Sequence, residues 1–135
     1  MPTVLKRLLV LLLLLCNLAF ANADDVKKVV FHINNPAKVN YLAEGVSNLR
    51  RVSPNSDIVV VFNGRAVVTV SLMGQQENIV KELIGQGVKL GACTTAMLKL
   101  KMPADALIEG VEYIHEGGML RLMKLQEQGY SYIKM

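Results

Sequence analysis

Short runs of β-branched residues alternate along the chain with longer stretches in which apolar residues recur at helical spacing. Continuous apolar runs, typical of strands covered on both faces, occur at residues 26–33 and 57–63, and a shorter one at 88–92. Mixed patterns at 110–114 and 130–134 predict two further strands nearer the edges of a sheet. Helices are predicted between the strands, at 37–52, 75–86, 94–102 and 118–128. The stretch 66–73 fits either an extended piece or a short helical turn.

This alternation predicts an α/β fold: a three-layer α/β/α sandwich with a five-stranded, mainly parallel sheet of the flavodoxin-like, doubly wound kind. Such sheets bind ligands beyond the carboxyl ends of their strands, where the strand order reverses. With the common order 2-1-3-4-5, that point lies between the first strand, ending at Ile33-Asn34-Asn35, and the third, ending at Ala92-Cys93. We therefore expect Cys93 to lie in this crevice, open to solvent.

The first 23 residues have the pattern of a secretory leader. Lys6 and Arg7 precede the aliphatic run Leu8 to Leu15, and Ala21-Asn22-Ala23 offers small residues to a signal peptidase. We expect a signal peptide at 1–23, a single domain at 24–135 and a periplasmic or secreted product. Cleavage lowers the formal net charge from +4 to +2, and no run of basic residues remains, so nucleic acid is not expected as a partner.

The leader also allows a second interpretation, in which it stays attached as a membrane anchor. Its apolar stretch, read out to Phe20, has 13 residues, fewer than the roughly 18 to 20 that span a bilayer, which disfavours such an anchor. After cleavage of the leader, no membrane association is expected. Lipid attachment at Cys16 is disfavoured because Leu15 precedes it where a small residue is required. Removal of the leader leaves Cys93 as the sole cysteine and excludes an internal disulfide.

Cys93 has two interpretations from its position alone. A cysteine at the start of a helix faces backbone N–H groups and the positive end of the helix dipole, which favour its thiolate. A free cysteine at a strand end is equally often a small core residue.

Other chemistries fit the residues less well. Cys93-Thr94-Thr95-Ala96 lacks the second thiol of a dithiol motif, and His32, inside a strand, is more often a buried, hydrogen-bonded residue than a catalytic base. His115 ends the fourth strand, which the expected strand order places away from the crevice. A soft-metal site with Met97 is conceivable, although a methionine at helical spacing is more often core. We expect no metal, and no cofactor because the first strand is not followed by a phosphate-binding loop.

Three segments of the chain resemble the DsrE/DsrF-like proteins, including the YchN-like group. The segments are KVVFH at 28–32, VKLGAC at 88–93 and QGYSYIK at 128–134, of which the Gly-x-Cys step and the last segment are the most specific. The resemblance implies the five-stranded fold, assembly into homo- or heterohexamers, and a role in sulfur relay. In relay members, a cysteine just after the third strand carries sulfur as a persulfide, and Cys93 matches that position. The known relay members are cytoplasmic, whereas this chain has the pattern of an exported protein.

The resemblance therefore favours an exported sulfur carrier, similar to a sulfurtransferase, that acts through Cys93 on a small sulfur compound or a partner thiol. The alternative is a non-catalytic oligomeric binding or assembly module in which Cys93 is structural. For the carrier, backbone N–H groups at Thr94, Thr95 and Ala96 are expected to stabilise the persulfide. The side chains expected to line the crevice are those of Asn34, Asn35 and Arg65, although all three also lie in plain turn sequences.

The apolar residues of the last predicted helix, at 118–128, indicate contact between subunits. Its apolar residues cover more than one face, whereas a helix of a small domain usually needs one apolar stripe. These residues are Met119, Leu120, Leu122, Met123 and Leu125. We expect a homo-oligomer, a trimer or a hexamer, with a deeply packed helix as the alternative explanation.

Overall fold

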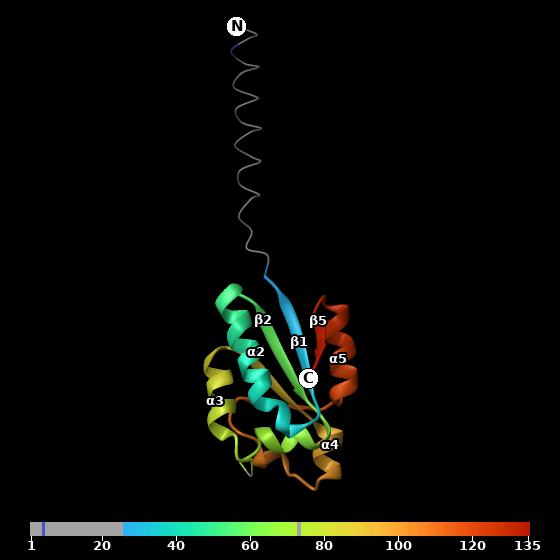
Figure 1. Ribbon diagram of the computed structural model, residues 1–135. Helices are drawn as coiled ribbons and strands as arrows, with labels where there is room; N and C mark the ends of the chain where they lie inside the picture. The colour runs from blue at the N-terminus through green and yellow to red at the C-terminus, as the bar shows by residue number, and fades with distance from the viewer. Residues whose placement is uncertain (1–3, 5–25, 73) are drawn as a thin grey trace.

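The computed structural model describes Val4 and residues 26–72 and 74–135, so the predicted leader, with Cys16, lies outside the described residues apart from Val4. The described domain contains a single parallel sheet with helices on both faces (Figure 1). The strands are β1 (Lys28–Ile33), β2 (Asp57–Phe62), β3 (Lys89–Cys93), β4 (Val111–Ile114) and β5 (Ser131–Lys134). Within the described part of the chain, no helix has the length and apolar character needed to cross a membrane.

The helices alternate with these strands, as the hydrophobic pattern predicts. The α-helices are α2 (Val39–Val52), α3 (Glu77–Gly85), α4 (Thr94–Lys99) and α5 (Gly118–Glu127). Short 3₁₀ helices are η1 (Pro36–Lys38), η2 (Gly64–Val70) and η3 (Ala104–Ala106). The ambiguous stretch after residue 65 is thus mostly helical, and α4 ends three residues earlier than expected.

The strand order differs from the expected one. The sheet runs β4-β3-β2-β1-β5, with every neighbouring pair parallel, so the expected order 2-1-3-4-5 is wrong. The chain winds outward from β1 to β4 and then returns to place β5 on the free side of β1. β2 therefore separates β1 from β3, and the reversal lies between β1 and β5. The expected placement of β4 and β5 at the edges is confirmed.

The two faces of the sheet are covered unequally. On one face, α2, α3 and η2 pack over a large core that includes Leu42, Val60 and Phe62. On the other face, α5 contributes Leu122 and Leu125 to a smaller cluster of six buried residues, the others being Val30, Val59, Val61 and Ile114. In the described domain, one ten-residue helix thus covers most of the second face.

His32 lies within β1 on the side of the smaller cluster. Its side chain is 8% exposed, and its Nδ1 lies 2.8 Å from the Tyr132 hydroxyl on β5. The expectation of a buried, hydrogen-bonded imidazole is confirmed. Burial and then the nearby Lys134 ammonium lower the pKa of His32 below its usual 6.5.

Leu42→Ala tests the larger core. Leu42 is fully buried, so its truncation removes apolar contacts and leaves a cavity, and we expect the free energy of unfolding to fall by about 2–5 kcal/mol. Val52→Ala on the same helix is the control, because Val52 is 70% exposed, and we expect its effect to stay within about 0.5 kcal/mol. Urea denaturation measures both. Equal losses in the two variants would contradict the assigned core.

His32→Gln tests the buried imidazole. Since folding lowers the pKa of His32, the unfolded chain binds the extra proton, and stability is lost as the pH falls below about 6.5. We expect the free energy of unfolding of the wild type to decrease between pH 7 and 5, and this residue to contribute a slope of at most about 1.4 kcal/mol per pH unit. The variant should show a flatter profile in the same window. Identical slopes would show that His32 is not held neutral.

Candidate functional site

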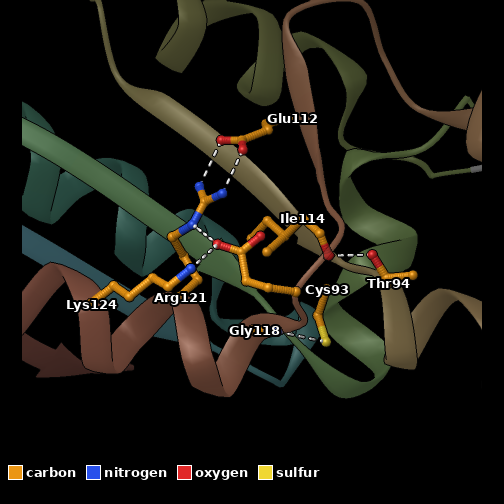
Figure 2. A network of polar contacts seen from close by, with 8 residues as sticks. Cys93, Thr94, Glu112, Ile114, Gly118, Arg121 and Lys124 are labelled. Carbon is orange, nitrogen blue, oxygen red and sulfur yellow. Dashed lines mark hydrogen bonds and ion pairs between the residues drawn. The ribbon is translucent and has the colours of Figure 1, made fainter.

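Cys93 stands at the junction of β3 and α4, where the last residue of the strand is also the N-cap of the helix. Its Sγ accepts a hydrogen bond from the backbone N–H of Gly118, 3.1 Å away, at the first residue of α5 (Figure 2). The sulfur therefore lies at the N-terminal ends of two helices, its own and α5. Backbone N–H groups and the helix dipole both favour negative charge at such a position.

The expectation that Cys93 is open to solvent is wrong. Its side chain is 3% exposed and belongs to the larger buried cluster. The cause is the start of α5, because the buried backbone at Gly118 lies against the sulfur and buried Gly117 precedes it. Sequence reasoning placed the cysteine at the correct edge of the sheet and missed this cover.

Glycine is needed at both covering positions. Gly117 has a φ of +86°, in the region that disfavours other residues, and a Cβ there would lie 3.4 Å from Thr95 Oγ1. A Cβ on Gly118 would lie 3.1 Å from the Cβ of Cys93 and 3.4 Å from its Sγ. The cover can approach the sulfur this closely only because no side chain intervenes.

A second glycine contact and one side-chain hydrogen bond fix β3 and α4 against β4. Cys93 pairs in register with Ile114, and a Cβ on Gly91 would lie 2.7 Å from Ile114 Cδ1. The Thr94 hydroxyl donates to the Ile114 carbonyl (Figure 2). Thr94 thus binds the neighbouring strand through its side chain.

Arg121 anchors the first turns of α5 to β4 (Figure 2). Its guanidinium makes two hydrogen bonds to Glu112, of 2.8 and 2.6 Å, and one of 2.8 Å to Glu116, which Lys124 approaches at 3.8 Å. Hydrogen bonding to Arg121 lowers the pKa of Glu116 to about 2, so this network stays ionised at physiological pH. It holds the residues that cover Cys93.

A cavity of about 260 Å³ lies at the same edge of the sheet as Cys93 and is lined in part by the helix that follows it. Its lining comes from the end of β2, the start of η2 and α4. The lining residues are Asn63, Gly64, Arg65, Thr95, Ala96, Lys99 and Leu100. Three residues of the expected site, Arg65, Thr95 and Ala96, are thus brought together one strand away from where the crevice was expected.

Asn34 and Asn35 do not join this cavity. Asn34 accepts a hydrogen bond of 2.9 Å from Lys134 Nζ, and Asn35 caps η1 by accepting from the Ala37 backbone at 3.0 Å. Their distance from Cys93 follows from the strand order, because β2 lies between β1 and β3. The contact of Asn35 supports the turn interpretation, whereas Asn34 bonds to the last strand.

The other candidate ligands and bases lie in different surroundings. Met97 is fully buried in the larger core, and His115 packs edge-on against Tyr113 with ring centroids 4.8 Å apart. His115 follows β4, which lies directly beside β3, as the expected order also had it. In the described ranges, no three His, Cys, Asp or Glu side chains gather closely enough to hold a metal ion.

Several residues of the site were missed by sequence reasoning. They are Gly118, Arg121 and its two carboxylate partners, and the cavity residues Asn63 and Lys99. The Gly117-Gly118 pair signalled the start of a helix, but nothing in the sequence indicated that this start reaches the third strand. The contact spans 25 residues and exists only in the folded chain.

The apolar residues of α5 fall into a buried group and an exposed group, as their excess over one stripe suggested. Leu122 and Leu125 are buried, whereas Met119, Leu120 and Met123 are 65%, 44% and 57% exposed. An apolar strip therefore begins beside the cover of Cys93 and runs along the outer side of the helix.

Comparison with known proteins shows what this fold resembles. The model of the DsrE/DsrF-like family matches residues 11–135. A solved structure from Methanobacterium thermoautotrophicum, described as the protein of unknown function MTH1491, shares 31% identity with a TM-score of 0.76, covering 81% of this chain and 99% of the other. The ychN protein from E. coli shares 21% identity and the fold, with a TM-score of 0.69, covering 82% and 100%.

No curated protein matched the chain in a sequence search. The family match spans nearly the whole sequence, and the five-stranded parallel α/β fold agrees with that of both solved structures. We conclude that the chain belongs to the DsrE/DsrF-like family, a membership that links it in general terms to sulfur relay.

Proposed function

We propose that this protein is an exported sulfur carrier, which holds sulfane sulfur as a persulfide on Cys93 and passes it to a partner thiol. The observation that supports this most strongly is the hydrogen bond from the Gly118 N–H to Cys93 Sγ. An N–H donor at the start of a ten-residue helix stabilises a sulfur anion, and both the thiolate and the persulfide are anions in this cycle. The predicted leader supports export.

The transfer needs no base beyond solvent. Cys93 loses its proton to water, and its thiolate attacks the sulfane sulfur of a donor, whose sulfur bond breaks as the leaving group departs with the electron pair. The product is Cys93–S–S⁻. An acceptor thiolate then attacks the terminal sulfur, and the Cys93 thiolate leaves. The protein returns to its starting state, while the acceptor carries the extra sulfur.

Access to the sulfur requires a movement, because the side chain is 3% exposed. The backbone at Gly118 lies against the sulfur, and we propose that the turn at Gly117 and Gly118 withdraws when a donor or acceptor approaches. The pairs of Arg121 with Glu112 and Glu116 hold the turn closed by tying α5 to β4 and to a residue just beyond the end of that strand. The carrier is therefore protected between transfers.

The exposed strip of Met119, Leu120 and Met123 supports a homo-oligomer in which a second copy covers it. A trimer or a hexamer fits this proposal. Such contact places the cover of Cys93 at the rim of a subunit interface, because Met119 follows Gly118 directly.

A binding or assembly module is the second candidate function. The burial of Cys93 favours it, since a sulfur atom within the larger core contributes packing without any chemistry. The two functions differ in what they predict for the native thiol.

Loading with sulfur tests the carrier. After incubation of the protein with polysulfide, we expect intact-mass analysis to show a gain of one sulfur atom that dithiothreitol reverses. Cys93→Ser should show no gain, because a hydroxyl of similar size keeps an acceptor for the Gly118 N–H and forms no persulfide. A thiol that reacts only after denaturation would support the module and contradict the carrier.

Arg121→Leu tests whether the start of α5 controls access to the thiol. Loss of its three charged hydrogen bonds should favour the open turn, and we expect the rate of alkylation of native Cys93 by iodoacetamide to rise about two- to fivefold, as about 0.4–1 kcal/mol implies.

The matched control is Lys124→Leu on the same helix. Its ammonium makes one contact of 3.8 Å to Glu116, and we expect the alkylation rate to stay unchanged. Equal rates in wild type and Arg121→Leu would show that the network does not govern exposure of the sulfur.

A further inference from the structure

We infer that the cavity beside α4 is the subsite for the oxyanion end of a small sulfur donor of the thiosulfate class. The inference rests on the proposed carrier function and adds the chemical class of its donor. Two cations, Arg65 and Lys99, and two uncharged polar side chains, Asn63 and Thr95, line the cavity.

The charge of the cavity is unbalanced. None of its lining residues is acidic, and in the described part of the chain neither Arg65 nor Lys99 has a carboxylate within ion-pairing distance. By contrast, Lys89 is paired with Asp57 and Arg121 is paired with Glu112. Two unpaired cations at one cavity attract a dianion, and a guanidinium hydrogen-bonds to oxyanions in a fixed geometry.

The size and polarity of the cavity further restrict the class of ligand that it can bind. A cavity of about 260 Å³ is smaller than the roughly 300–1,000 Å³ typical of sites for drug-sized ligands, so it suits a small anion. Ala96 and Leu100 add an apolar wall. Thiosulfate combines three oxygens, which suit the cations, with one polarisable sulfur, which suits the apolar wall.

The cavity also borders the cover of Cys93. Asn63 Nδ2 lies 3.9 Å from Met119 Sδ, and Thr95 Oγ1 lies 3.4 Å from the position of a Cβ on Gly117. Two lining residues therefore contact the segment 117–119 that lies over the sulfur. The cavity thus adjoins the segment whose Gly118 N–H donates to Cys93 Sγ.

A second cavity on the molecule lacks these properties. It is larger, at about 520 Å³, but two carboxylates, Glu77 and Glu109, line it together with one cation, Lys81. Lys81 is paired with Glu77 at 2.6 Å, so no free positive charge among its described lining residues faces that space. Charge thus favours the cavity beside α4 over this larger one as the place for an anion.

The reaction at this site balances in charge and atoms. The Cys93 thiolate attacks the sulfane sulfur of thiosulfate, a new S–S bond forms, and the S–S bond of thiosulfate breaks. Sulfite leaves as a dianion with the electron pair, and Cys93–S–S⁻ remains. Arg65 and Lys99 hold the oxygens of the departing sulfite, so they act on the donor without touching the thiol.

Binding of thiosulfate to Cys93→Ser, measured by isothermal titration calorimetry, separates binding from chemistry. We expect the double substitution Arg65→Gln and Lys99→Gln in this background to weaken binding at least tenfold. The matched control, Lys38→Gln with Lys81→Gln, removes the same charge from outside the cavity and should leave binding unchanged. Absence of binding to Cys93→Ser, or equal weakening by both double substitutions, would overturn the inference.

Sulfur loading distinguishes this inference from the carrier function. With Cys93 intact, the Arg65→Gln and Lys99→Gln variant should lose loading from thiosulfate and keep loading from polysulfide, which has no oxyanion end. Unchanged loading of this variant from thiosulfate would contradict the proposed subsite without contradicting the carrier function. A third outcome is that thiosulfate binds through Arg65 and Lys99, but neither thiosulfate nor polysulfide loads Cys93 with sulfur. That outcome would support the anion site and contradict the carrier function.

Discussion

The hydrogen bond between the Gly118 N–H and Cys93 Sγ joins the two parts of the molecule on which the site depends. It connects the end of an interior strand to the start of α5, the helix that covers the second face of the sheet. The contact requires backbone in direct reach of sulfur, which explains the glycine at 118, while the positive φ of the preceding residue explains the glycine at 117. It favours a charged sulfur and at the same time excludes water from it, so chemistry and protection come from the same few atoms.

The unequal covering of the sheet explains where the exposed features gather. The face under α2 and α3 contains most of the buried side chains, whereas α5, among the described helices, serves the other face. One helix over several strands leaves an outer side exposed, and there Met119, Leu120 and Met123 lie. Because apolar packing is sparse on this face, the ionic contacts of Arg121 with Glu112 on β4 and with Glu116 help to hold α5 against the sheet. The site, the apolar strip and the polar anchor thus share one helix.

Much of the fold could be predicted from the chain because its signals are local. A strand such as β2 depends on consecutive β-branched residues, and nearby turn residues, Pro36 after β1 and Gly64 after β2, mark where the strands end. The link between Cys93, a strand end and a helix start is likewise a matter of adjacent residues. The cavity cations Arg65 and Lys99 lie 34 positions apart, and no pattern in the sequence relates them.

The sequence by itself determined the elements, the parallel α/β class and the position of Cys93 at the carboxyl edge of the sheet. Only the tertiary structure decided the strand order, the separation of Asn34 from Cys93 and the burial of the sulfur beneath α5. The physical reason is that periodicity and turn residues act over a few neighbours, whereas strand order and burial depend on how α5 and β5 pack against distant strands. Several arrangements satisfy the same local pattern, and packing selects one.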